Sequence, residues 1–232
     1  LRSFIQDSLD IADPLVDYHD YDYVMLVHAG NDQASSGDSD DIWSCASLGK
    51  WHFNNDGGVE LGISIVAETD PYGVYAHEFG HNLGLVDLYE VDGWSLMAIG
   101  EWFNPPSSIL ADEKMRLGWI KDSNISTVEN GQILNVTISR LETPGPKLAV
   151  KIPLNNSVYY VVEYRRKILT DAALPMEGII ITYVDETEGP AAYTIRVIDA
   201  NESTRTLGDA AFTAGTRFVD FDHEVAVRVW SL

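Results

Sequence analysis

The hydrophobic pattern of the chain changes near residue 122, and this change limits the folds open to it. Before residue 122, strand-like alternation is mixed with helix-like spans. After it, short β-branched and aromatic runs are separated by turn residues, a pattern that favours a β-sandwich. We therefore predict an α+β chain with two domains, 1–122 and 123–232, of which the second is β-sandwich-like. The runs of the second part are Ile133–Ser139, Leu148–Ile152, Val158–Tyr164, Ile179–Val184, Tyr193–Ile198 and Val225–Trp230.

The charge of the chain is strongly negative and unevenly distributed. The 232 residues include 15 Lys and Arg against 36 Asp and Glu, a formal net charge of −21. Residues 1–122 hold 22 of the acidic side chains and only five of the basic ones. Such a surface repels phosphate backbones and anionic lipids, so we expect neither a nucleic-acid nor a membrane partner. The apolar runs are also too short to span a bilayer. The acidity fits Ca²⁺ binding and, equally, a role in solubility alone.

The first part contains a helix whose two ends are marked in the sequence. Asp70 offers an N-cap acceptor, and Pro71 follows at the first helical position. Gly84 supplies the left-handed stop. We predict a helix of about 13 residues between these signals, a common length for globular proteins. Two strand candidates and a second helix candidate lie in the same part: Tyr23–Val27, Val59–Ala67 and Ser108–Leu117.

The marked helix contains the motif HExxH. With about 100° between successive residues, His77, Glu78 and His81 share one sector of the helix. Two imidazoles one turn apart can bind a single Zn²⁺, and the glutamate between them can take a proton from zinc-activated water. The motif thus predicts a zinc site with Glu78 as general base. Another face is expected to pack on a sheet: Ala76, Gly80 and Leu83.

A catalytic zinc usually has a third protein ligand and one open position. Asp87 is the candidate, because Gly84 can turn the chain so that this carboxylate returns to the metal. The alternative is that Asp87 only orients His81 while water fills the site. The glycine spacing favours direct ligation.

Two residues downstream are candidates for supporting roles. Ser95–Ala98 is a candidate turn beneath the site, with Met97 as its apolar floor. Tyr89 can donate a hydrogen bond to an oxyanion, or it can simply pack; the packing interpretation is favoured.

Arg165 and Arg166 beside Glu163 are expected to form surface ion pairs, which contribute little to stability. A Ca²⁺ loop and an ordinary exposed acidic loop are equally compatible with four aspartates: Asp32, Asp38, Asp40 and Asp41.

The zinc motif and its surroundings resemble the immune inhibitor A family of secreted, metzincin-type metalloendopeptidases. The resemblance is strongest in HEFGHNLGLVDLYE (77–90) and GWSLMAIGEW (93–102). Five further segments add to it: VMLVHAG (24–30), SGDSDDIWS (36–44), ADEKMRLGWI (111–120), VYYVVEYRRK (158–167) and LPMEGIIITYVDE (174–186).

The resemblance implies a metzincin-like catalytic domain, in which a twisted mixed sheet packs with an active-site helix and a second helix, followed by a β-domain. It implies zinc bound by the two motif histidines and Asp87, with Glu78 as base. It also implies export, activation from a longer precursor and bound calcium. Two residues depart from the family pattern, because Val86 replaces a proline and Cys45 replaces a histidine.

We therefore expect a secreted zinc endopeptidase that acts as a monomer on proteins or peptides. Four N-glycosylation sequons after residue 122 are a further indication of secretion. By analogy with metzincins, a substrate would pair with the strand Val59–Ala67. Two other classes stay open. One is a catalytically inactive zinc-fold binding or adhesion module of the cell envelope, which the intact Glu78 disfavours. The other is a calcium-dependent structural domain in which HExxH is accidental.

Overall fold

The computed structural model describes residues 1–189 and 192–232 as a mixed α+β protein with several sheets and few helices. Two compact units make up the chain, Leu1–Val86 and Asp87–Leu232. No helix in the described ranges is long and apolar enough to cross a membrane. The helices are α1 (Arg2–Ala12), α2 (Gln33–Ser36), α3 (Tyr72–Asn82) and α4 (Ala111–Arg116). The strands are β1 (Tyr23–His28), β2 (Cys45–Ala46), β3 (Trp51–Phe53), β4 (Val59–Ala67), β5 (Ile125–Thr127), β6 (Ala149–Pro153), β7 (Val158–Arg165), β8 (Gly178–Asp185), β9 (Thr194–Val197), β10 (Arg217–Asp220) and β11 (Val225–Arg228).

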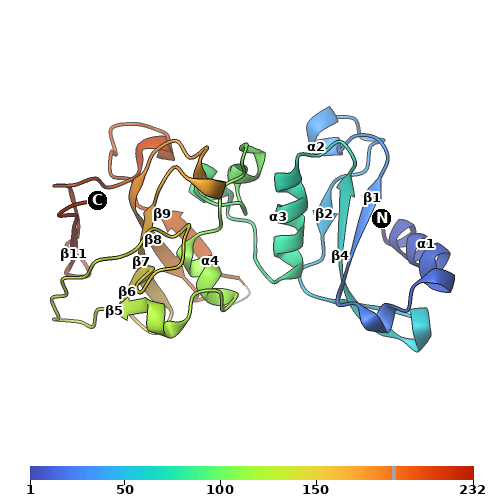
Figure 1. The fold of residues 1–232 in the computed structure, drawn as a ribbon, viewed down its shortest axis with the longest axis horizontal. Helices are drawn as coiled ribbons and strands as arrows, with labels where there is room; N and C mark the ends of the chain where they lie inside the picture. Colours follow the sequence, from blue (N-terminus) through green and yellow to red (C-terminus); the bar gives the residue numbers. More distant parts are fainter. Residues whose placement is uncertain (190–191) are drawn as a thin grey trace. The chain divides into compact units, whose positions relative to one another are not determined.

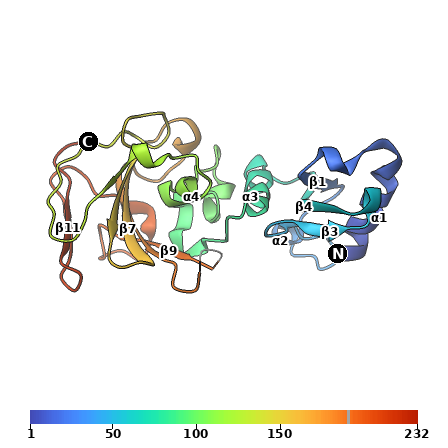
Figure 2. The ribbon, with the colours of Figure 1, turned by 90° about the horizontal axis from the view of Figure 1, so that it is seen from below.

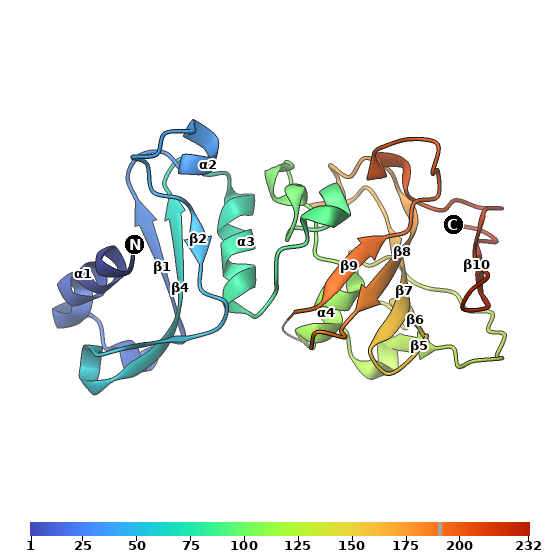
Figure 3. The ribbon, with the colours of Figure 1, turned by 180° about the vertical axis from the view of Figure 1, so that it is seen from behind.

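The first unit is built around β4, which has the bounds predicted from its alternation. β1 pairs with β4 in parallel, from Tyr23 opposite Gly62 to His28 opposite Ala67. β2 and β3 both pair antiparallel with β4. Helices α1 and α3 lie on opposite faces of this sheet (Figures 1 and 3). The core on the α1 side includes Ile5, Leu9, Leu61 and Ile63.

The position of β4 contradicts the expected docking of substrate on this strand. β4 is not an edge strand, because β1 occupies one side of it and β2 and β3 occupy the other. Between β2 and β3, the backbone of Ile63 bonds to Ser47: its N–H donates to Oγ over 2.9 Å, and its carbonyl accepts from the Ser47 N–H over 2.8 Å. The backbone groups that a substrate would need are therefore already used within the sheet. The edge strands next to β4 on this side are β2 and β3.

The end signals of the zinc-motif helix are confirmed at one terminus and wrong at the other. Gly84 has φ +99°, the left-handed conformation expected of a helix stop. At the start, Pro71 is the N-cap residue and no side chain caps the helix. Asp70 instead accepts hydrogen bonds from Ser44 Oγ (2.6 Å) and the Ala67 N–H (2.9 Å). Its carboxylate therefore closes the turn after β4.

The second unit contains a five-stranded sheet in the order β5-β6-β7-β8-β9 and a separate β10–β11 hairpin. Seen from below, the hairpin and α4 lie on opposite sides of β7 (Figure 2). Side chains of Tyr160, Val162, Ile181 and Phe218 join the sheet and the hairpin in one apolar core. The arrangement is a sheet covered on one face by a hairpin, which is smaller than the two full sheets of a sandwich.

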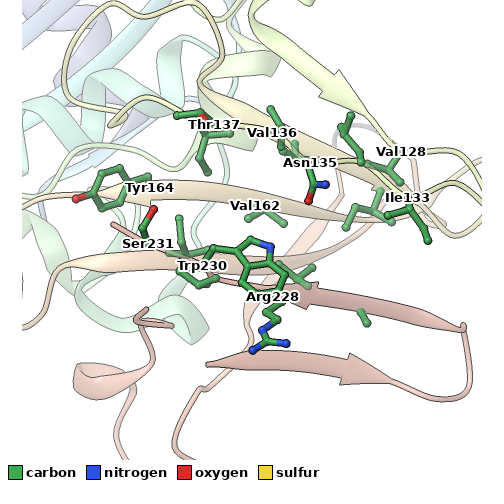
Figure 4. A pocket seen from close by; sticks show the side chains of 18 of the residues that line it. Val128, Ile133, Asn135, Val136, Thr137, Val162, Tyr164, Arg228, Trp230 and Ser231 are labelled. Atoms are coloured by element: carbon green, nitrogen blue, oxygen red, sulfur yellow. The ribbon is translucent and has the colours of Figure 1, made fainter. Parts of the chain in front are cut away.

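One predicted strand is absent. Ile133–Ser139 forms no β-ladder, and Ile133 is 96% exposed. The segment instead borders a cavity of about 740 Å³, whose other walls include Val162, Tyr164 and the C-terminal residues around Trp230 (Figure 4). None of the candidate zinc ligands lines this cavity.

The division between the compact units also differs from the predicted boundary near residue 122. Residues 87–122 pack with the β-rich part, and hydrogen bonds connect the two segments. Trp94 Nε1 donates to the Leu207 carbonyl over 2.7 Å. The Ala111 N–H donates to Glu163, and Arg165 donates to the Trp94 carbonyl over 3.0 Å. The functional domains 1–122 and 123–232 stay a prediction.

Candidate metal centre

Helix α3 carries the motif, and the structure brings its two histidines together with Asp87. One ligand atom from each of His77, His81 and Asp87 lies within 4.8 Å of the others. The two imidazole rings are 4.8 Å apart between centroids and nearly perpendicular, at 84°. His77 and Glu78 are buried, His81 is half-buried and Asp87 is exposed. The three predicted ligands are thus in reach of a common ion, on eleven consecutive residues.

The turn after α3 determines which nitrogen of His81 can bind a metal. Nδ1 of His81 lies 2.8 Å from the Leu85 carbonyl oxygen. A carbonyl only accepts, so Nδ1 carries the hydrogen and Nε2 carries the lone pair. Such an outer hydrogen bond is the usual partner of a metal-binding histidine. The left-handed Gly84 makes the turn that returns the Leu85 carbonyl to the helix.

Polar side chains fasten α3 to the sheet. Asn82 is buried, and its Nδ2 donates to the carbonyls of Ser47 and Ile63, each over 3.0 Å. Its Oδ1 accepts from Ser64 Oγ. The prediction of Ala76 as a sheet-packing residue is wrong, because Ala76 is exposed. The sequence reasoning missed Asn82; its only signal was an amide directly after the second motif histidine.

The surroundings of Glu78 include Cys45, at the position where the resemblance suggests a histidine. Burial is the main cause that raises the pKa of the Cys45 thiol to about 11, and the negative charge of Glu78 contributes to the same shift. In the metal-free protein the thiol is therefore neutral at physiological pH.

The two supporting candidates have different surroundings. Ser95–Ala98 forms the predicted turn, with the Ala98 N–H donating to the Ser95 carbonyl over 3.2 Å. Met97 is fully buried in it. Tyr89 is 58% exposed, so its ring is mostly open to solvent rather than packed in a core.

The four aspartates of the candidate Ca²⁺ loop do not form a metal-binding group in the described part of the chain. Asp32 is buried, and its two carboxylate oxygens accept from the backbone of Ser44 (2.7 Å) and Ser35 (3.2 Å). Asp38 accepts from the Asp40 N–H over 3.0 Å. These carboxylates shape their own loop. A different group with donor atoms within 4.8 Å consists of Asp17, His19 and Asp56, all exposed.

The donor set of α3 and its following turn fits zinc. Tetrahedral zinc binds nitrogen and carboxylate oxygen at about 2.0–2.2 Å, which places ligand atoms roughly 3.4–3.6 Å from one another. Small side-chain rotations would bring the donors of His77, His81 and Asp87 from within 4.8 Å to that spacing. Two imidazoles with one carboxylate are typical ligands of zinc that has a catalytic role.

Comparison with known proteins gives a distant and partial match. No family model matches the chain. Immune inhibitor A of Bacillus thuringiensis subsp. alesti is 32% identical over 105 residues, covering 35% of this chain and 15% of that protein. The alignment therefore spans only a small part of the relative's length.

Proposed function

We propose that this chain is the zinc-dependent catalytic part of a secreted, metzincin-type endopeptidase that hydrolyses internal peptide bonds of proteins. The convergence of His77, His81 and Asp87 carries the proposal. The buried Glu78 on the same helix turn and the partial match to Immune inhibitor A support it. The resemblance of the motif segments and the four sequons support secretion.

The residues of the chain have separate tasks in this reaction. When bound, zinc would polarise the scissile carbonyl and lower the pKa of the attacking water towards 7. The Glu78 carboxylate accepts a proton from this water, whose oxygen bonds to the carbonyl carbon. As the C–N bond breaks, Glu78 passes the proton to the departing nitrogen. The Leu85 carbonyl holds His81 in the tautomer that can bind a metal through Nε2.

The test is zinc content and casein hydrolysis of the wild type and of Glu78→Gln. Loss of a general base lowers rates by about 10²–10⁴-fold, so Glu78→Gln should lose at least about 100-fold in hydrolysis and keep one zinc per chain. His77→Ala should lose the zinc. The exposed His52→Gln is the matched control and should change neither.

Each other outcome contradicts the proposal. A wild type without zinc removes the metal site. Full hydrolysis by Glu78→Gln refutes Glu78 as the base. A wild type that binds zinc and proteins without cleaving them would instead establish the adhesion module as the function.

A further inference from the structure

A line of hydrogen bonds runs from helix α4 to the peptide bond that follows Asp87. Oε2 of Glu113 accepts from Ser95 Oγ over 2.7 Å. Ser95 Oγ in turn accepts from the Met97 N–H over 3.0 Å. The Met97 carbonyl accepts from the Leu88 N–H over 2.7 Å. That N–H belongs to the peptide group between Asp87 and Leu88. The hydrogen bond from Leu88 to Met97 therefore restricts the backbone conformation of Asp87.

The residues of this line are buried. Ser95, Met97 and Glu113 each have 0% exposure. Glu113 is itself held by the start of its helix, since Oε2 also accepts from the Leu110 N–H over 2.7 Å. A buried hydrogen bond that is broken here has no solvent to replace it, so the line is maintained as a unit.

We propose that Glu113 is a positioning residue for Asp87, acting through Ser95 and the Met97 turn to hold the third ligand ready for the metal. This inference rests on the proposed zinc site. Ligand-orienting partners beyond the metal ligands typically contribute 10–100-fold to metal affinity. Asp87 is the ligand most in need of such support, because it is exposed and lies outside helix α3.

The protonation of Glu113 agrees with this role. Its Oε1 is buried and has no hydrogen-bond partner among the described residues. Burial is the main cause that raises the pKa of Glu113 to about 7, and the charges of Asp112 and Glu163 contribute to the same shift. A proton on Oε1 leaves Oε2 as the acceptor for both Ser95 and Leu110. Glutamine reproduces that arrangement, with its amide oxygen in the place of Oε2.

The experiment measures zinc affinity by competition with a fluorescent chelator, and the exchange rate of the Leu88 amide hydrogen. We expect Glu113→Ala to weaken zinc binding about tenfold or more and to speed Leu88 exchange. Glu113→Gln should restore affinity to within about twofold of the wild type. Ser95→Ala breaks the same line at its next member, so it tests the same role if Glu113→Ala fails to fold. The double variant should lose no more affinity than either single variant.

The matched control is Glu142→Ala. Glu142 is another carboxyl of the same unit with a buried, unpartnered oxygen, Oε2. Glu142 is not a member of the line: its Oε1 accepts from the Arg166 N–H and lies 3.9 Å from Arg165 Nε. This variant should lose stability and keep its zinc affinity. Unchanged affinity in both Glu113→Ala and Ser95→Ala, with one zinc bound to the wild type, would overturn the positioning role alone. Absence of zinc from the wild type would overturn the proposed function instead.

Discussion

Nδ1 of His81 donates a 2.8 Å hydrogen bond to the carbonyl oxygen of Leu85. The two residues are only four positions apart, yet the bond needs the chain to reverse between them. Gly84 makes the reversal at φ +99°. The tautomer of a candidate metal ligand is therefore coupled to the conformation of one glycine.

Gly84→Ala should weaken zinc binding. A Cβ at this position meets nothing within 4 Å, so the cost comes from the backbone conformation alone, about 1–2 kcal/mol for a left-handed residue. Relief of this strain would move the Leu85 carbonyl away from His81. Chelator competition measures the affinity. Gly49→Ala is the control, because Gly49 has φ +77° and equally open surroundings. It should lose similar stability and keep zinc affinity; equal zinc affinity in both variants would contradict the coupling.

Asn82→Ala should destabilise the first unit by about 3 kcal/mol. The change removes the side-chain donor to the Ser47 carbonyl, one of the two donors to the Ile63 carbonyl, and the short acceptor of the Ser64 hydroxyl. Each buried polar group left unsatisfied costs roughly 1–3 kcal/mol. Urea denaturation of the metal-free protein measures the loss. The exposed Asn54→Ala should stay within about 0.5 kcal/mol of the wild type. A similar small effect of Asn82→Ala would show that this amide does not fasten α3.

Removal of zinc should lower the melting temperature. A ligand that binds only the native state stabilises it by about 4 kcal/mol when its concentration is 1,000 times Kd. Scanning calorimetry with and without a chelator gives the difference. The same treatment of His77→Ala should leave its melting temperature unchanged, since that variant would hold no zinc. A chelator effect that persists in His77→Ala would indicate that another site binds the stabilising metal.

The metal-free protein should become less stable as pH rises from about 5 to 8. The pKa values of Glu113 and Glu142 are raised to about 7, chiefly by burial, from 4.5 in the unfolded chain. Between these values the native state holds more protons than the unfolded state, so the free energy of unfolding falls with pH. Glu113 accounts for a loss on the order of 3 kcal/mol, complete somewhat above pH 7, and Glu142 acts in the same direction.

Urea denaturation at pH 5 and pH 8 checks this dependence. Replacing both Glu113 and Glu142 with glutamine should flatten it. Equal stability of the wild type at the two pH values would show that neither carboxyl retains its proton in the native state.

Local signals in the sequence predicted the elements that depend on local physics. Alternation placed β4 correctly, and Gly84 ended α3 where expected. The spacing of HExxH and Asp87 identified side chains that do converge. Each of these inferences concerns residues close together in the chain, where helix and strand geometry fixes which side chains share a face.

Features that depend on distant partners were not predictable. Nothing in Val59–Ala67 indicates that strands pair with both of its sides. Ile133–Ser139 has the alternation of a strand, but a strand needs a neighbour, and none pairs with it in the described structure. Asp70 was expected to cap a helix, but its carboxylate accepts hydrogen bonds from Ser44 and Ala67 instead.

Burial of charge was the largest error of this kind. Arg165 was expected at the surface and is fully buried, 2.7 Å from Asp171 and 3.0 Å from Glu163. Charged side chains are almost never buried unless paired, and besides Glu163 on the same strand, Arg165 has partners in two other segments, Glu142 and Asp171. Only the folded structure brings them together.

The lone extended segment at Ile133–Ser139 has a consequence for handling the protein. Its apolar residues Ile133, Leu134 and Val136 are exposed and the segment forms no β-ladder, so strands of other molecules can add to it. At low ionic strength, the net charge of −21 keeps molecules apart. Salt shortens the range of that repulsion to about 3 Å at 1 M. Salt concentrations of about 1 M, as used for precipitation or storage, should therefore promote β-rich aggregation. Buffers of low ionic strength should suppress it.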